Sequence, residues 1–395
     1  MSPSNHAGCN RFGSRLKTLI KTSDFALVNF EGPATTSKNP IPKSGPSIKM
    51  DPNSTKIVKE LGFSGVTLAN NHIMDYGEEG LFQTITNCKE LDLKICGAGA
   101  NAAEALKPII LRLNNGFRIA IFSLCEREFG VCTGKSPGSA WISDPQAIKE
   151  VSKARNGADF VIVIAHGGIE DVPIPPLSRQ KQLRNLIDSG ANVIIGHHPH
   201  VPQGWEKYKG GYIFYSLGNL IFDYPNGKRH VKTEWGYIVQ MSFKNCCLDE
   251  IDIILTKQQK NVVDCMNEDL EYKCSIKYLQ RLCEIITDDN FHIYWKETSR
   301  KIFDKKYKNY LDYICGPKLF RQKVAMVAFL IRDMIISNAK TDLTKKHLLL
   351  LNLMRNESHS CVMENFVEAS SDEIDNSKNY GIKNEVDQLM KWTIE

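Results

Sequence analysis

The sequence predicts an α/β fold with a helical C-terminal extension. Over residues 1–255, short apolar runs typical of buried strands alternate with segments whose apolar residues recur at helical spacing. This alternation favours sheets covered by helices on both faces. Over residues 256–362 helical spacing dominates, and residues 363–395 form an acidic tail. We therefore expect three parts, with boundaries near residues 255 and 362.

The expected elements follow one another along the first part. Each apolar run ends at a turn or at a polar cluster, and each amphipathic segment keeps its apolar residues on one face. The predicted strands are 25–30, 65–69, 119–124, 160–165, 192–195, 212–217, 237–243 and 248–255. The predicted helices are 11–22, 53–61, 80–91, 145–155 and 177–189.

The composition limits the class of protein. The chain has 395 residues, 42% hydrophobic and 24% charged, with a net charge of +5 that does not argue for nucleic-acid binding. Its 12 cysteines contain no C-x-x-C pair, which favours reduced thiols in the cytoplasm. No apolar stretch reaches the roughly 18 to 20 residues of a membrane span. As written we expect a cytoplasmic protein; a true start upstream would make it membrane-associated or extracellular.

The extension and the tail carry opposite charge. Residues 291–362 hold 14 Lys and Arg against 6 Asp and Glu, a balance of +8. That excess indicates either solvated helix faces or a docking surface. Residues 363–395 hold 3 basic and 8 acidic residues, a balance of −5, which predicts a partly flexible segment followed by a short terminal helix.

Three histidines lie where the predicted strand 192–195 meets a loop, namely His197, His198 and His200. An extended chain sends alternate side chains to one face, and Pro199 biases His198 toward extended geometry. We therefore expect His198 and His200 to face one object. Neutral imidazole is the commonest metal ligand, so a metal ion is favoured over a histidine-rich surface loop.

Three further polar clusters follow predicted strands. Taken singly, each is explained by turn chemistry or by a hydrogen-bonded core histidine. Together they favour one site, because open α/β sheets bind ligands at the carboxyl ends of their strands. The side chains suit Mn²⁺, Fe, Zn²⁺ or Mg²⁺, and His72 is the best candidate for an unliganded proton donor. The clusters are Asn29 with Glu31; Asn70, Asn71 and His72 with Asp75; and His166 with Glu170.

Five motifs in order resemble the capsule-synthesis CapA family, the poly-γ-glutamate synthesis proteins. That family is related to the calcineurin-like metallophosphoesterases, and the resemblance covers about residues 20–245. The motifs are NFEGP (29–33), ANNHIMDYG (69–77), HGGIE (166–170), GHHPHVPQ (196–203) and YSLGNLIFD (215–223).

The resemblance implies a two-sheet α/β/β/α sandwich of the metallophosphoesterase type, holding one or two divalent ions. Asn71, His166, His198 and His200 would match metal ligands, and Glu31 would fall near the bridging carboxylate. His72 would match the catalytic histidine. For Asn219 and Asp223, turn chemistry and strand capping are equal alternatives to a role at the site. The residues that would lie beside the ligands or the substrate are Asn29, Asn70, Asp75, Glu170, His197, Asn219 and Asp223.

One family feature is missing. Members of the family begin with a strand ending in Gly-Asp, whose aspartate would hold the first metal, and this chain contains no Gly-Asp pair. Either the start codon has been placed too far downstream or the first metal position has been lost. We favour the first explanation, because loss of an interior strand would expose the edges of its neighbours.

These features predict a metal-dependent hydrolase acting on phosphate ester or amide bonds in an anionic surface polymer. The expected partners are that polymer or its precursor and other capsule-synthesis proteins. The alternative is a non-catalytic subunit or polymer-binding component of a capsule synthesis and export complex. The missing aspartate favours the alternative, whereas the intact histidines favour the enzyme.

Overall fold

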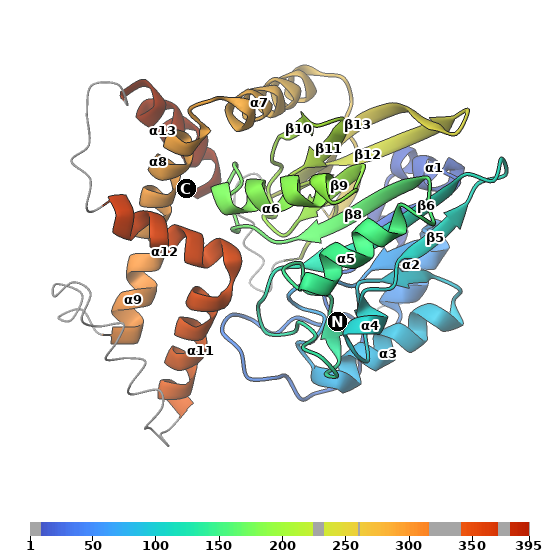
Figure 1. The fold of residues 1–395 in the computed structure, drawn as a ribbon, viewed down its shortest axis with the longest axis horizontal. Helices are drawn as coiled ribbons and strands as arrows, with labels where there is room; N and C mark the ends of the chain where they lie inside the picture. The colour runs from blue at the N-terminus through green and yellow to red at the C-terminus, as the bar shows by residue number, and fades with distance from the viewer. Residues whose placement is uncertain (1–8, 224–232, 260, 316–340, 370–379, 395) are drawn as a thin grey trace.

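The computed structural model describes residues 9–223, 233–259, 261–315, 341–369 and 380–394. It confirms the α/β class (Figure 1). The largest sheet has six strands in the order β10-β11-β9-β8-β6-β5. Its central members β6, β8, β9 and β11 are parallel, and the outer strands β5 and β10 are antiparallel to their neighbours. The six strands are β5 Ile109–Arg112, β6 Arg118–Cys125, β8 Phe160–His166, β9 Val193–His197, β10 Trp205–Tyr208 and β11 Gly211–Phe214.

Three smaller sheets complete the strands of the described chain. β1, β2 and β3 form a parallel sheet; β12, β13 and β14 form an antiparallel one; and β4 pairs with β7. Phe243 of β12 has its ring centroid 5.1 Å from that of Phe160 on β8, so β12 packs on the central sheet. The bounds are β1 Leu27–Asn29, β2 Gly65–Thr67, β3 Lys94–Cys96, β4 Ala98–Gly99, β7 Gly138–Ser139, β12 Trp235–Lys244, β13 Cys247–Gln259 and β14 Val262–Cys265.

Four helices of the first part, α2, α3, α5 and α6, lie between parallel strands. Their ends carry the expected local signals: Asp144 accepts a hydrogen bond from the Gln146 backbone at the start of α5, and Gly62 ends α2 with φ +104°. Every residue of β8 is buried, as expected for a central parallel strand between layers. The helices are α1 Ser14–Thr22, α2 Ser54–Leu61, α3 Gly77–Glu90, α4 Ala102–Ala105, α5 Pro145–Ala154 and α6 Leu177–Asp188.

The extension packs against the α6 side of the central sheet (Figure 1). α12 contacts both α6 and α8, so the extension shares one hydrophobic core with the sheet. None of the described helices is both long and apolar enough to cross a membrane. The elements are α7 Leu270–Thr287, α8 Phe291–Ile302, the π-helical turn η2 Phe303–Tyr307, α9 Lys308–Cys315, α11 Thr341–Arg355, α12 Glu357–Ala369 and α13 Tyr380–Ile394.

The predicted elements are confirmed with small shifts at their ends, and short strands were missed. β3, β5 and β10 have three or four residues each and were not predicted. β13 and β14 continue past residue 255, and α12 crosses residue 362, while the three-part division stays a prediction. The short terminal helix is confirmed as α13. The predicted flexible segment falls largely on residues 370–379, which lie outside the described residues.

Candidate metal centre

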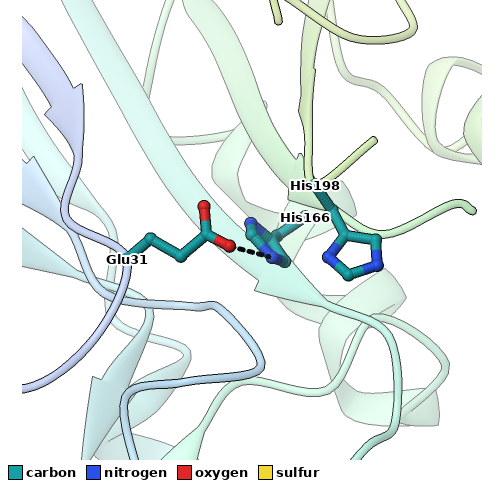
Figure 2. A group of neighbouring side chains, drawn as sticks. All are labelled: Glu31, His166 and His198. Carbon is teal, nitrogen blue, oxygen red and sulfur yellow. Dashed lines mark ion pairs between the residues drawn. The ribbon is translucent and has the colours of Figure 1, made fainter. Parts of the chain in front are cut away.

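Strand ends from two sheets bring Glu31, His166 and His198 together (Figure 2). His166 is the last residue of β8, and His198 follows the end of the neighbouring parallel strand β9. Glu31 lies two residues past the end of β1 and approaches the imidazoles from the opposite side. The predicted convergence of strand-end side chains is therefore present in the structure.

The distances suit a shared cation. The ligand atoms of Glu31, His166 and His198 lie within 4.8 Å of one another. Glu31 Oε1 is 3.8 Å from His166 Nε2 and 3.7 Å from His200 Nε2. Two ligands that are each about 2.1 Å from one ion lie at most about 4.2 Å apart. These two pairs meet that limit, and a ligand atom of His198 lies within 4.8 Å of those of Glu31 and His166.

The polar atoms of the cluster are unusually short of partners. Glu31 Oε1, His166 Nδ1 and His198 Nδ1 are buried and have no hydrogen-bond partner among the described residues. Buried polar groups in proteins are nearly always paired, and an unpaired carboxylate oxygen carries a desolvation cost. A divalent cation bound here would satisfy the Glu31 oxygen, so these residues fit a metal ion of the kind that carboxylate and imidazole prefer.

Two asparagines hold the imidazoles in place. Asn71 Oδ1 lies 2.9 Å from His166 Nε2, and Asn219 Oδ1 lies 2.9 Å from His200 Nδ1. An amide oxygen only accepts, so His200 Nδ1 donates to Asn219, and His166 Nε2 donates to Asn71 as long as it holds no ion. His200 Nε2 consequently keeps a free lone pair that faces Glu31. Such hydrogen bonds fix the tautomer of metal-binding histidines, which gives Asn219 a role beside the ligands.

Burial keeps most of these imidazoles neutral. It lowers the pKa of His198 to about 3, against the opposing charge of Glu170, and the pKa of His197 to about 4. The pKa of His166 falls well below its usual value, through burial and through the neighbouring imidazoles, including that of His72. For His200, burial lowers the pKa but the charges of Glu31 and Glu170 outweigh it and raise the net value. Neutral imidazole is the form that binds metal.

The backbone around Pro199 differs from the prediction. His198 has φ +103° and His200 has φ +60°, so the predicted extended segment is wrong. Residues other than glycine rarely take positive φ, and such strain gathers at functional sites. The ring centroids of His198 and His200 still lie 6.1 Å apart at the same site. Two left-handed residues, rather than strand alternation, turn both imidazoles toward Glu31.

His72 lies in a buried charged group. Its Nδ1 is 2.7 Å from Asp75 Oδ2, and Lys43 Nζ is 2.6 Å from Asp75 Oδ1 and 3.1 Å from His72 Nδ1. The backbone N–H of Ile48 donates to the same carboxylate at 2.7 Å. Asp75 thus orients the His72 ring through Nδ1. Lys43 belongs to an irregular segment after β1 and was not predicted from the sequence.

Asn29 and Asn70 support the loops rather than contact the imidazoles. The Asn29 amide donates to Glu31 Oε2 at 3.2 Å, which leaves Oε1 to face the histidines. Asn70 donates to the Phe30 carbonyl at 2.9 Å and accepts from the His72 backbone at 3.1 Å. Asn70 therefore ties the two loops that carry Glu31 and His72.

Glu170 and Asp223 lie at the margins. Glu170 Oε2 is 3.5 Å from Lys306 Nζ on η2. Burial alone would raise the pKa of Glu170, but the charges of Lys306 and the nearby imidazoles outweigh burial and lower this pKa. Asp223 accepts two hydrogen bonds from Arg11, at 2.5 and 2.7 Å, and 59% of its side chain is exposed. The role of Asp223 beside the ligands stays a prediction.

Two carboxylates beside the cluster were missed. Glu128 Oε2 accepts from Asn71 Nδ2 at 3.3 Å. Glu126 is buried with Arg179, whose Nη1 lies 3.3 Å from Glu126 Oε1. Burial raises the pKa of Glu126, and the guanidinium opposes that rise. Glu126 and Glu128 lie two and four residues past the predicted strand 119–124, so the strand-end rule that found the other clusters also applied here.

Comparison with known proteins identifies the family. The sequence model of the family described as bacterial capsule synthesis protein PGA_cap matches residues 3–224. That segment is more than half of the chain and includes every residue of the cluster. The chain belongs to this capsule-synthesis family, which confirms the resemblance to CapA.

Several relatives carry names that agree with the family. The capsule biosynthesis protein CapA of Bacillus anthracis is 38% identical over 229 residues, 54% of this chain and 55% of that protein. The PGA biosynthesis protein CapA of Bacillus subtilis is 36% identical over 221 residues, 55% of this chain and 58% of that protein. The "Probable polyglutamine synthesis accessory protein" of Mycobacterium tuberculosis is 26% identical over 227 residues, 54% and 60% of the two chains. The chain thus spans just over half the length of these relatives.

Proposed function

We propose that this protein is a metal-dependent hydrolase that cleaves a phosphate ester or an amide bond in an anionic capsule polymer or in its precursor. The convergence of Glu31, His166 and His198, each with a buried unpaired ligand atom, carries the proposal. The order of motifs along the chain supports a metallophosphoesterase-type sandwich as the framework of the site. Other capsule-synthesis proteins are the proposed partners.

In this proposal a set of strand-end residues holds the metal ion. One or two ions of Mn²⁺, Fe, Zn²⁺ or Mg²⁺ would be held by five side chains drawn from four loops. When bound, such an ion lowers the pKa of water and neutralises charge that develops on the substrate. The neutral imidazoles need not lose protons before they bind it. The five residues are Glu31, Asn71, His166, His198 and His200.

His72 supplies the proton for the leaving group in this proposal. Asp75 accepts a hydrogen bond from Nδ1 at 2.7 Å, which holds one proton on that nitrogen and leaves Nε2 to transfer another. Lys43 and the Ile48 backbone fix the Asp75 carboxylate, so the ring keeps one orientation. A general acid fixed in this way contributes about 10²- to 10⁴-fold to a rate.

A non-catalytic subunit is the second candidate. One observation favours it: the Mycobacterium tuberculosis relative carries the name "Probable polyglutamine synthesis accessory protein". A subunit of this kind would keep the cluster and hold an ion without turning over a substrate.

The test restores metal to chelator-treated protein. Hydrolysis of a chromogenic phosphodiester and shortening of poly-γ-glutamate are measured after addition of Mn²⁺, Zn²⁺, Mg²⁺ or Fe²⁺. We expect at least one ion to restore activity, and His72→Asn to lower it by about 100-fold or more with unchanged metal content. His292→Asn, at an exposed histidine of α8, is the matched control.

Each result decides between the candidates. Full activity in chelator, or an unaffected His72→Asn variant, contradicts the hydrolase proposal. A protein that binds one ion per chain but turns over neither substrate supports the non-catalytic subunit.

A further inference from the structure

Two arginines from distant parts of the chain, Arg127 and Arg355, each have a guanidinium group over an aromatic ring. Arg127 follows β6, and Arg355 is the last residue of α11. The guanidinium carbon of Arg127 is 5.3 Å from the centroid of the Trp141 ring, and that of Arg355 is 4.6 Å from the centroid of the Phe129 ring. Stacking of this kind holds a guanidinium while its N–H groups stay available in its own plane.

Neither guanidinium group forms an ion pair with a carboxylate of the described residues. Nε and Nη2 of Arg355 are buried and have no hydrogen-bond partner among those residues. Arg127 is hydrogen-bonded through its backbone N–H, which donates to Glu357. Burial and the nearby charge of Arg127 lower the pKa of Arg355, and the charge of Glu128 opposes them. Two neighbouring cations repel each other, and an anion bound between them would relieve that repulsion.

The arginine pair is fixed in position. Glu357, the first residue of α12, accepts from the Arg127 backbone at 2.9 Å and from Trp141 Nε1 at 2.7 Å. The corner between α11 and α12 is therefore tied to the loop after β6. That loop also carries Glu128, whose carboxylate accepts from Asn71, and Asn71 in turn contacts His166. A short chain of contacts thus connects the pair to the metal ligands.

We propose that Arg127 and Arg355 form a binding site for an oxyanion of the substrate, a carboxylate or phosphate group next to the bond that is cleaved. The proposal rests on the proposed function, because it takes the anionic polymer or its precursor as the ligand. Two guanidinium groups with free N–H edges match the planar, bidentate acceptors of such groups. Arg355 lies beyond the matched residues 3–224, so the helical extension contributes to substrate recognition.

The test measures binding in the presence of excess chelator, which separates it from metal-dependent turnover. Calorimetric titrations use inorganic phosphate in one arm and a short poly-γ-glutamate oligomer in the other. We expect Arg355→Gln and Arg127→Gln each to weaken binding of at least one ligand by about tenfold or more. Arg355→Lys keeps the charge and should recover part of the affinity. Lys345→Gln removes a charge from an exposed position on the same helix and should change nothing.

The two arms identify the anion. A loss confined to the oligomer assigns the site to polymer carboxylates, and a loss confined to phosphate assigns it to a phosphate-bearing precursor; both support the site. Equal affinities for the wild type and both glutamine variants, whose folding is verified by urea denaturation, overturn it. Weaker binding in chelator supports the site even if no metal restores hydrolysis. Metal-restored hydrolysis with an unchanged KM in both variants overturns it while the hydrolase stands.

Discussion

Two buried carboxylates at strand ends, Glu31 and Glu126, lie in opposite hydrogen-bonding environments. Glu126 accepts from Ser358 at 2.9 Å and from the Gly168 backbone at 3.3 Å, and it pairs with Arg179. Glu31 has one oxygen paired with Asn29 and the other buried without a hydrogen-bond partner among the described residues. Both glutamates contact His166: Glu31 Oε1 lies 3.8 Å from Nε2, and the Glu126 backbone N–H donates to the His166 carbonyl at 2.9 Å.

The two environments indicate different roles: Glu126 stabilises the fold, whereas Glu31 is suited to bind a ligand. The Glu126 group is saturated by donors of its own chain and joins α12 to the central sheet. The Glu31 group keeps acceptor capacity that the chain leaves unused, at a cost in folding free energy. A buried carboxylate alone therefore does not indicate a site; the unpaired atoms do.

Breaking the saturated group should have the largest effect on stability. Arg179→Met leaves Glu126 buried without its cation, and we expect a loss of about 3 to 5 kcal/mol in the free energy of unfolding. Urea denaturation in chelator measures it. Arg118→Met, which removes one partner of an exposed pair with Asp159, is the control and should cost less than about 1 kcal/mol. Similar losses in the two variants would contradict the structural role of Arg179.

Removing the support of a ligand should affect metal affinity. Asn219→Ala removes the oxygen that accepts the Nδ1 proton of His200, so the tautomer of His200 is no longer fixed. We expect the affinity for Zn²⁺ or Mn²⁺ to fall by about 10- to 100-fold in a competition titration with a metal indicator. Asn365→Ala, within α12, should leave the affinity unchanged. An unaltered affinity in Asn219→Ala would remove His200 from the ligand set.

The extension should be sensitive to acid at His359. Its Nδ1 contacts the Tyr307 hydroxyl, and burial, aided by the charge of Lys306, lowers its pKa to about 4. The unfolded chain binds this proton first, so the contribution is complete above about pH 6.5 and is lost as the pH falls toward 4. We expect the wild type to lose about 1 to 2 kcal/mol more than His359→Gln over that interval.

Urea denaturation at pH 7.5 and pH 4.5 gives the comparison, with His292→Gln as the control on the surface of α8. Parallel losses in the wild type and in His359→Gln would show that His359 is protonated as readily in the folded protein as in the unfolded chain.

The smallest effect is expected at Glu31 itself. Since Glu31 Oε1 has no hydrogen-bond partner among the described residues, Glu31→Gln should leave the metal-free protein unchanged or up to about 1 kcal/mol more stable. The same substitution should weaken metal binding. Unfolding in chelator, followed by metal titration, measures both. A loss above about 2 kcal/mol in chelator would mean that Glu31 is a stabilising residue like Glu126.

Most of the fold could be predicted from the sequence because its strands and helices alternate. Buried strands such as β8 are continuous apolar runs, and α5 begins at a clear Asp-Pro signal. Strands of three or four residues, such as β3 and β10, are too short for a period to be recognised. β14 was missed because the surrounding residues have helical spacing.

The site was partly predictable for the same reason. The strand-end rule located Glu31, His72, His166 and His198, since each polar cluster follows an apolar run. Positive φ at His198 could not be foreseen, because Pro199 favours extended geometry before it. Contacts between positions far apart in sequence, such as Glu126 with Ser358 or Arg127 with Glu357, leave no local pattern.

The central claim is that Glu31, His166 and His198 hold a divalent cation, and anomalous diffraction from crystals soaked in Mn²⁺ tests it most directly. We predict an anomalous peak within about 2.0 to 2.3 Å of the Glu31 carboxylate and of the two imidazoles. The matching crystal of Glu31→Gln with His166→Ala should show none. Wild-type crystals at saturating Mn²⁺ with no peak between these residues would contradict the account.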